Sequence, residues 1–178
     1  MAAGVLSNLS VLVVDDKEPI RELICGILEN FGVPDVRQAA DANSAFRDLQ
    51  AHTPDAVITD LKMQPIDGLA FTRSVRTDPD SPAPNVPILM VTGHCEKHHV
   101  EEARDAGVTD FIAMPVTSNT IAERLTSAIQ RPREFVRARA FVGPDRRRRQ
   151  LPMVASASRR ASDWTRDAET GVQVSAQG

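Results

Sequence analysis

The chain has 178 residues, of which 42% are hydrophobic and 25% are charged. This balance is typical of soluble globular proteins and excludes fibrous and wholly disordered classes, and the length suits one ordinary domain with some additional chain. No apolar run is long enough for a membrane span and the N-terminus lacks a signal-peptide pattern, so we expect a cytoplasmic protein. Two distant cysteines, Cys25 and Cys95, argue against a disulfide framework.

Charge divides the chain into two regions. Residues 1–130 carry 10 Lys and Arg against 19 Asp and Glu, a net charge of −9, and residues 131–178 carry 11 against 5, a net charge of +6. Only the first region has periodic apolar residues, and the composition of the second buries too little apolar surface to offset chain ordering. We therefore predict a folded domain over 1–130 and a basic, mostly disordered tail over 131–178, in which only 133–141 can form a short helix.

Short apolar runs alternate with helical periods over residues 5–130, which predicts βαβ units and a parallel sheet. The predicted strands cover residues 10–14, 35–39, 56–59, 87–91 and 109–112. The first helix is the clearest, because its apolar residues recur at helical spacing between Ile20 and Phe31, and Gly32 is placed to end it. The other predicted helices cover residues 43–51, a segment after Asp67-Gly68, residues 96–106, and a segment from a Thr117 or Ser118 cap to Pro132.

Oxygen-bearing side chains follow three of the predicted strands. Asp15 and Asp16 follow the first strand, Asp60 follows the third, and Thr92 follows the fourth. The carboxyl ends of parallel strands meet at one edge of a sheet, where open α/β folds place their ligands. Three carboxylates brought together there would repel unless a cation or a proton intervened, and Mg²⁺ suits a site of this kind.

These landmarks resemble the receiver domain of bacterial two-component response regulators, over about residues 9–130. Asp15-Asp16 resembles the acidic metal pair, Asp60 in Asp60-Leu-Lys-Met-Gln-Pro-Ile-Asp-Gly68 matches the phosphate-accepting aspartate, and Thr92-Gly93 matches the switch threonine and its small neighbour. Phe111 stands at the position of the switching aromatic residue. The resemblance implies a doubly wound, flavodoxin-like, five-stranded parallel sheet in the order 2-1-3-4-5.

The resemblance also implies a function. Asp60 would accept a phosphoryl group from a sensor histidine kinase or a phosphotransfer protein, and Mg²⁺ would be held by Asp15, Asp16, Asp60 and the backbone carbonyl of Lys62. The protein would be a stand-alone response regulator rather than an enzyme, since the tail has no composition for an attached effector domain. Its output would be contact with a downstream protein through the fourth helix, the fifth strand and the fifth helix.

Met114 departs from the family, which has a lysine at this position. A thioether neither carries charge nor donates a hydrogen bond to a phosphoryl oxygen, so the phosphorylated state should lose about 1.5–3 kcal/mol of stabilisation. Three interpretations remain open. Asp60 is phosphorylated with weakened coupling to Thr92 and Phe111; or Lys17 or Lys62 supplies a partial substitute cation; or the domain is a scaffold that does not depend on phosphorylation.

A hypothesis of another class makes the protein a nucleic-acid binder whose arginine-rich tail is controlled by the receiver domain. Four consecutive arginines at 146–149 can pair with phosphates. The charge of −9 on residues 1–130 opposes this interpretation, and the tail lacks interleaved aromatic residues for base stacking. We therefore expect protein partners rather than nucleic acid.

Overall fold

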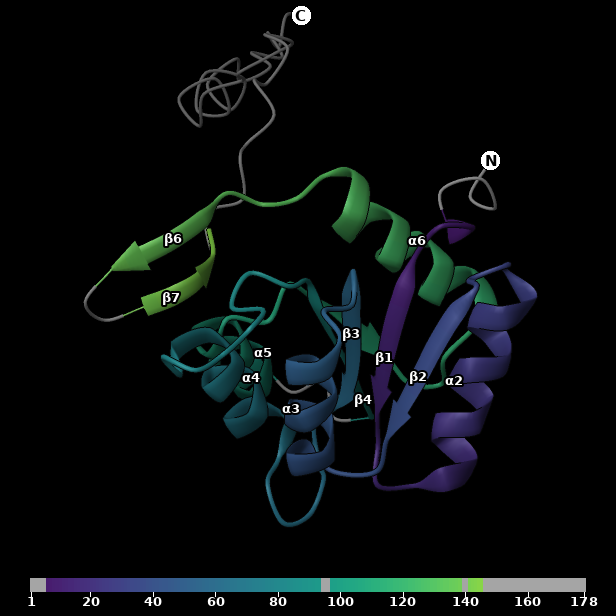
Figure 1. Ribbon diagram of the computed structural model, residues 1–178, viewed down its shortest axis with the longest axis horizontal. Coiled ribbons are helices and arrows are strands. Elements are labelled where there is room, and N and C mark those ends of the chain that lie inside the picture. The colour runs from purple at the N-terminus through teal and green to yellow at the C-terminus, as the bar shows by residue number, and fades with distance from the viewer. Residues whose placement is uncertain (1–5, 94–96, 139–140, 146–178) are drawn as a thin grey trace, which may run out of the picture. The chain divides into compact units, whose positions relative to one another are not determined.

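Five parallel strands in the order β2-β1-β3-β4-β5 form the central sheet of the computed structural model (Figure 1). They are β1 (Ser10–Val14), β2 (Asp35–Ala39), β3 (Ala56–Asp60), β4 (Ile88–Thr92) and β5 (Asp110–Ala113). The order predicted for a doubly wound, flavodoxin-like sheet is confirmed. The structure describes residues 6–93, 97–138 and 141–145, all of which belong to one unit that spans residues 1–146.

Three strands, β3, β4 and β5, end one residue further toward the candidate site than predicted. Asp60 is the last residue of β3 and pairs with Val91, and Thr92 is the last residue of β4 and pairs with Ala113. The difference arises because pairing with the neighbouring strand continues past the apolar run on which the prediction was based. Asp60 and Thr92 are therefore positioned by the sheet rather than by the loops that follow it.

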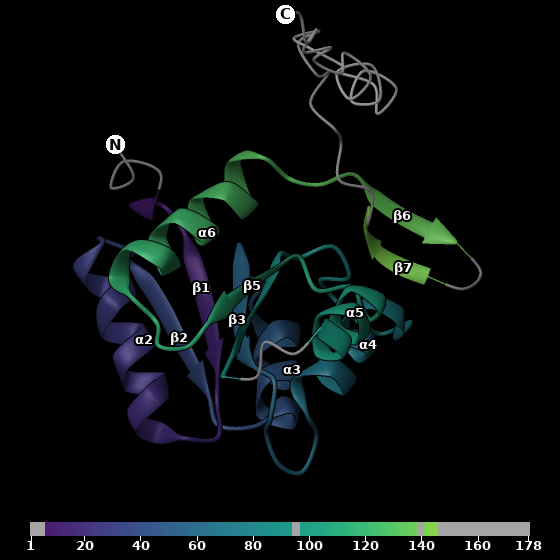
Figure 2. The same ribbon diagram turned by 180° about the vertical axis from the view of Figure 1, so that it is seen from behind.

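Alternate residues of the strands face different helical layers, as the two-residue period of a strand requires. Val11 and Val13 of β1 share a core cluster with residues of α2 (Glu18–Asn30) and α6 (Ser118–Gln130). Leu12 and Val14 share another with residues of α3 (Ala42–Ala51) and α4 (Gly68–Thr77). The remaining helix, α5 (Lys97–Ala106), lies beside α4, and Figure 2 shows this arrangement from behind.

Side-chain caps position the starts of two helices near the candidate site. The Asp67 carboxylate accepts a hydrogen bond from the Ala70 backbone at 2.7 Å, and the Thr117 hydroxyl accepts one from the Thr120 backbone at 3.2 Å. Thr117 is thus the cap of α6. Gly32 follows the end of α2 with a φ of +81°, as predicted for a helix terminus. None of the helices in the described ranges is long and apolar enough to cross a membrane.

The short helix considered possible over 133–141 does not form. β6 (Phe135–Ala138) and β7 (Phe141–Pro144) instead form an antiparallel hairpin, in which Phe135 pairs with Pro144 (Figure 1). Proline and glycine at the end of β7 oppose a helix, and the hairpin finds a packing surface because β7 contacts α4 and α5. The folded unit therefore continues past residue 130, and the disorder predicted for the rest of the tail concerns residues outside the described ranges.

A buried arginine attaches the hairpin to the domain. The side chain of Arg76 in α4 donates to the Gly107 carbonyl at 3.1 Å and to the Pro84 carbonyl at 2.8 Å, and its guanidinium lies 5.4 Å from the centre of the Phe135 ring. Burial lowers the pKa of Arg76 to about 10.

Gly107 has a φ of +93°, and a Cβ there would lie only 2.9 Å from the Val142 carbonyl oxygen. Close packing of β7 therefore requires glycine at this turn.

Candidate functional site

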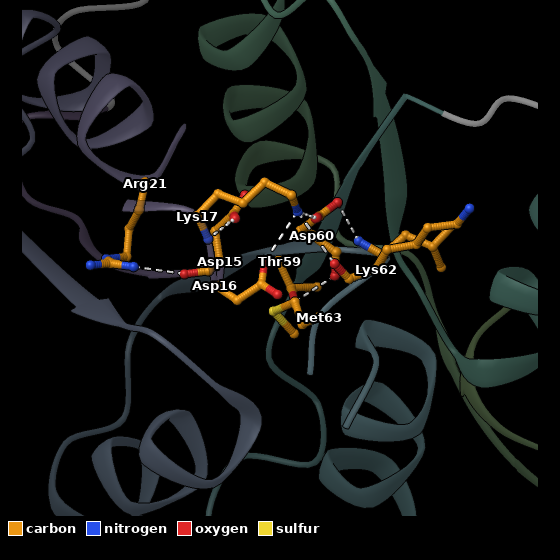
Figure 3. A network of polar contacts seen from close by, with 9 residues as sticks. Asp15, Asp16, Lys17, Arg21, Thr59, Asp60, Lys62 and Met63 are labelled. Carbon is orange, nitrogen blue, oxygen red and sulfur yellow. Dashed lines mark hydrogen bonds and ion pairs between the residues drawn. The ribbon is translucent and has the colours of Figure 1, made fainter. Parts of the chain in front are cut away.

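Three carboxylates lie together at the carboxyl ends of β1 and β3. Each of Asp15, Asp16 and Asp60 offers an oxygen atom within 4.8 Å of the others. The first two follow β1, and the third ends the adjacent parallel strand β3 (Figure 3). The structure thus brings together the acidic residues that the sequence analysis singled out.

Asp15 is the most buried of the three, with 1% of its surface exposed. One carboxylate oxygen accepts a hydrogen bond from the Lys17 backbone N–H at 2.8 Å. The other, Oδ2, is buried and has no hydrogen-bond partner within the described ranges. Burial raises the pKa of Asp15, the Lys17 hydrogen bond opposes this shift, and the charge of Asp60 adds to it. A buried carboxylate oxygen without a hydrogen-bond partner destabilises the folded state unless a cation or a proton binds to it.

Asp60 is oriented by its own strand end. Its Oδ1 atom accepts a hydrogen bond from the Leu61 backbone N–H at 2.7 Å, and the residue is 9% exposed. The loop that follows returns so closely that the Gly68 N–H donates to the Leu61 carbonyl at 2.9 Å. A Cβ at Gly68 would collide with the backbone carbonyl oxygen of Asp60. Glycine at the start of α4 is therefore needed for the observed position of Asp60.

The ammonium group of Lys17 lies among these acidic oxygens. It is 3.0 Å from Asp60 Oδ2 and 3.1 Å from Asp16 Oδ1, and it makes a longer contact of 3.5 Å with the Lys62 carbonyl oxygen (Figure 3). The hydrogen bond to Asp60 is the largest cause of a raised pKa of Lys17, so its ammonium form is strongly favoured. Of the two lysines considered as substitute cations, the structure brings the ammonium of Lys17 to Asp60.

A pocket of about 260 Å³ opens beside the carboxylates. Its lining residues come from four strand ends, the loops after them and the first turn of α2. They are Asp15, Lys17, Ile20, Asp60, Lys62, Thr92, Gly93 and Met114. Met114 is partly buried and packs, like Ile20, against the core cluster of α2 and α6. Part of the pocket wall is therefore apolar at the position where a lysine was expected from the family resemblance.

Thr92 and Phe111 occupy neighbouring strands. Thr92 is 2% exposed, and its backbone carbonyl accepts a hydrogen bond from the Met114 N–H at 3.0 Å. Phe111 pairs with Met90 in the register of β4 and β5 and packs, partly buried, against a cluster that includes Ala103 of α5. Thr92 thus borders the pocket directly, whereas Phe111 contacts the helical layer behind it.

The donor set fits a hard divalent cation. Carboxylate and backbone carbonyl oxygens are the ligands that Mg²⁺ prefers, and the orphaned Oδ2 of Asp15 is a buried oxygen suited to such an ion or to its bound water. Lys17 contacts the other two carboxylates, so part of the negative charge is neutralised by the chain itself.

Arg21 also belongs to this region, although it was not among the residues predicted for the site. Its guanidinium donates to the Asp15 backbone carbonyl at 2.8 Å and to the Gln38 side chain at 3.1 Å, and so braces the turn between β1 and α2. Its position in the first turns of the helix after the acidic pair was the only sign in the sequence of a role at the site. Solvent-exposed arginines are also common at such positions.

The site residues lie within the segment, residues 11–126, that matches the family model of the response regulator receiver domain. Chemotaxis protein CheY-3 of Vibrio cholerae is 29% identical over 131 residues, which are 74% of this chain and 99% of that protein. The receiver domain of NtrX from Brucella abortus has a TM-score of 0.62 at 31% identity, and the match covers 68% of this chain and 99% of that one. The receiver domain of the sensor histidine kinase PA1611 from Pseudomonas aeruginosa, solved with magnesium coordinated in its active-site cleft, has a TM-score of 0.62 at 25% identity, covering 69% and 98%.

Proposed function

The chain belongs to the response regulator receiver family of two-component signalling, and on this premise we propose that Asp60 accepts a phosphoryl group from a phosphohistidine donor. The donor would be a sensor histidine kinase or a phosphotransfer protein. In the transfer, the bond from phosphorus to the imidazole nitrogen breaks and a bond to an Asp60 oxygen forms. The imidazole nitrogen keeps the electron pair and takes up a proton.

The observation that carries this proposal is the position of Asp60. Its carboxylate ends a central strand, is held by the Leu61 N–H at 2.7 Å, and lines the pocket together with Thr92. A nucleophile fixed in this way loses little orientational freedom on reaction, which favours transfer. The hydroxyl of Thr92 is the neighbouring group that we assign to a phosphoryl oxygen.

We assign the metal to Asp15, Asp16, Asp60 and the backbone carbonyl of Lys62. Bound Mg²⁺ supplies positive charge for the phosphoryl oxygens, whose negative charge must be neutralised during transfer. Asp15 contributes its orphaned buried oxygen, and the Lys17 N–H keeps the other oxygen of Asp15 in place. These residues are placed by the ends of two adjacent strands and need no large rearrangement to share one ion.

Met114 makes the response to phosphorylation weaker in our proposal. Thr92 and Phe111 would form the switch, with Phe111 reporting to the face made by α5, β5 and α6, where we place the downstream protein. Without the lysine, the phosphorylated state lacks a charge-assisted hydrogen bond that contributes about 1.5–3 kcal/mol. A ligand shifts two conformations only by its differential affinity for them, so the active population would be smaller.

Phosphorylation with a small phosphodonor and Mg²⁺ tests the proposal. Intact mass should show one added phosphoryl group on the wild-type chain and on Met114→Lys, and none on Asp60→Asn. The conformational response is then measured by fluorine NMR on protein labelled with fluorophenylalanine. The signal that is missing from Phe111→Leu is assigned to Phe111. We expect a partial response in the wild type and a larger one in Met114→Lys.

Each failure of this experiment has a distinct meaning. A wild-type chain that takes up no phosphate from any donor would contradict the proposal and favour the phosphorylation-independent scaffold. Phosphate that persists in Asp60→Asn would place the acceptor elsewhere. A full Phe111 response in the wild type, with no gain in Met114→Lys, would show that the methionine does not weaken coupling.

A further inference from the structure

We propose that Lys17 is a tethered cation that holds the metal position in the resting domain, so that Mg²⁺ binds only by displacing its ammonium group. This inference deepens the proposed function and rests on it, because the site concerned is the same. In this proposal Lys17 occupies the position of the metal ion next to Asp60. This position differs from that of the lysine that Met114 replaces.

The ammonium group of Lys17 contacts oxygen atoms of three groups in the pocket. Its Nζ is 3.0 Å from Asp60 Oδ2, 3.1 Å from Asp16 Oδ1 and 3.5 Å from the Lys62 carbonyl oxygen. These three groups belong to the metal set assigned above, so the ammonium and a metal ion would use the same oxygens. An ammonium with three donors and a divalent ion cannot both occupy that position.

The backbone fixes where the side chain starts. The Lys17 N–H donates to Asp15 Oδ1 at 2.8 Å, which holds the Cα of Lys17 beside the pocket. The Lys17 side chain is 55% exposed, compared with 11% for Asp60 and 30% for Asp16. Its ammonium can therefore move into water, whereas the carboxylates stay. Displacement of Lys17 leaves the oxygen cluster intact for the metal.

Lys62 provides a matched control. It lines the same pocket, but no hydrogen bond from its ammonium to the three carboxylates exists within the described ranges, and Figure 3 shows its side chain extending away from them. Removing either lysine changes the net charge near the pocket by the same amount. Only removal of Lys17 takes away a group that competes for the metal-binding oxygens.

Calorimetric titration of the full chain with magnesium chloride tests the inference. An exposed ion pair is weak, so loss of Lys17 should strengthen Mg²⁺ binding modestly, by about fivefold in Lys17→Met. Lys62→Met keeps the backbone carbonyl assigned to the metal and should stay within about twofold of the wild type, because only long-range charge is lost. A second measurement follows the rate at which a trace amine-acetylating reagent modifies each lysine, read by peptide mass spectrometry. Saturating Mg²⁺ should accelerate modification of Lys17 in the wild type and leave Lys62 unchanged.

The outcomes separate this inference from the proposed function. Equal Mg²⁺ affinities in the wild type and Lys17→Met, or stronger binding in both lysine variants alike, would overturn the inference and leave the metal site standing. Lys17 acetylation that does not rise with Mg²⁺ would overturn it as well. Absence of Mg²⁺ binding in the wild type and in Lys17→Met would contradict the metal site itself, and the inference would fall with it.

Discussion

Arg76 offers a test of how the β6–β7 hairpin is held to the domain. We consider Arg76→Met, which keeps most of the aliphatic stem and removes the guanidinium. The change deletes the hydrogen bonds to the Gly107 and Pro84 carbonyls and the contact with the Phe135 ring. These three groups come from the turn after α5, the segment before β4 and the hairpin, so one side chain joins three parts of the chain.

The size of the effect follows from two opposing contributions. Two hydrogen bonds from a charged donor contribute about 3–6 kcal/mol together, and the ring contact adds about 1 kcal/mol. Burial of the cation opposes them, because it lowers the pKa of Arg76 to about 10 and leaves Nη2 without a hydrogen-bond partner in the described part of the chain. We expect a net loss of about 3 kcal/mol of unfolding free energy, which corresponds to roughly 10 °C in melting temperature for a domain of this size.

Urea unfolding monitored by circular dichroism measures this loss, and Arg73→Met is the matched control. Arg73 lies on the same helix with an exposed side chain, and its substitution should change stability by less than about 0.5 kcal/mol. Hydrogen exchange should also show earlier opening of the hairpin amides in Arg76→Met. An unfolding free energy of Arg76→Met equal to that of Arg73→Met would refute the reasoning, because the buried contacts would then contribute nothing net.

Three further expectations concern other parts of the domain. Gly68→Ala forces a Cβ against the Asp60 carbonyl, so it should lower the unfolding free energy by at least about 2 kcal/mol and slow phosphorylation. Gly26→Ala is the control, because its Cβ meets open space. Equal stability and equal phosphorylation rates in the two variants would contradict this expectation. The Ser44 backbone hydrogen bond lowers the pKa of Asp41 from its ordinary value of 3.8. Asp41→Ala should therefore lose about 1 kcal/mol of unfolding free energy above pH 3.8, and this loss should shrink as the pH falls through the lowered pKa. A difference between the two proteins that does not change with pH in unfolding scans would oppose this expectation. Burial raises the pKa of Cys25 to about 11, so alkylation of this thiol near pH 8 should require unfolding, and rapid labelling of Cys25 itself in the native chain, read by peptide mass spectrometry, would count against burial.

The sheet was predictable because its inner strands are buried on both faces. Such strands are continuous apolar runs, and those at 11–14 and 88–91 stand out from the helical periods between them. The meeting of Asp15 and Asp60 was predictable on the condition that their two strands are parallel neighbours, because such strands end at one edge of the sheet. The strand order came from the family resemblance, because apolar runs alone do not say which strands pair.

The hairpin was not predictable because its stability depends on a distant side chain. Phe135-Val136 and Phe141-Val142 are short apolar pairs in a region rich in arginine, and short pairs do not define a period. The packing partner of Phe135, Arg76, is a charged residue of α4 that sequence reasoning assigns to the surface.

The position of Lys17 was only partly predictable. Its place directly after the acidic pair made it a candidate cation together with Lys62. The choice between the two depends on the hydrogen bond from the Lys17 N–H to Asp15, which directs one side chain toward Asp60. A contact of this kind is set by the geometry of a single turn, and neighbouring residue types do not encode it.

The attachment of β7 has a practical consequence for the design of reporters and fusions. Arg76 ties the hairpin to Pro84 and Gly107, which precede β4 and β5, whereas the acidic pocket lies where the strands finish. The last described residue, Asp145, is bonded through its N–H to the Glu134 carbonyl at 2.7 Å. A fluorescent module joined after Asp145 would start from the rim opposite the pocket, and a phosphodonor could approach Asp60 without meeting it.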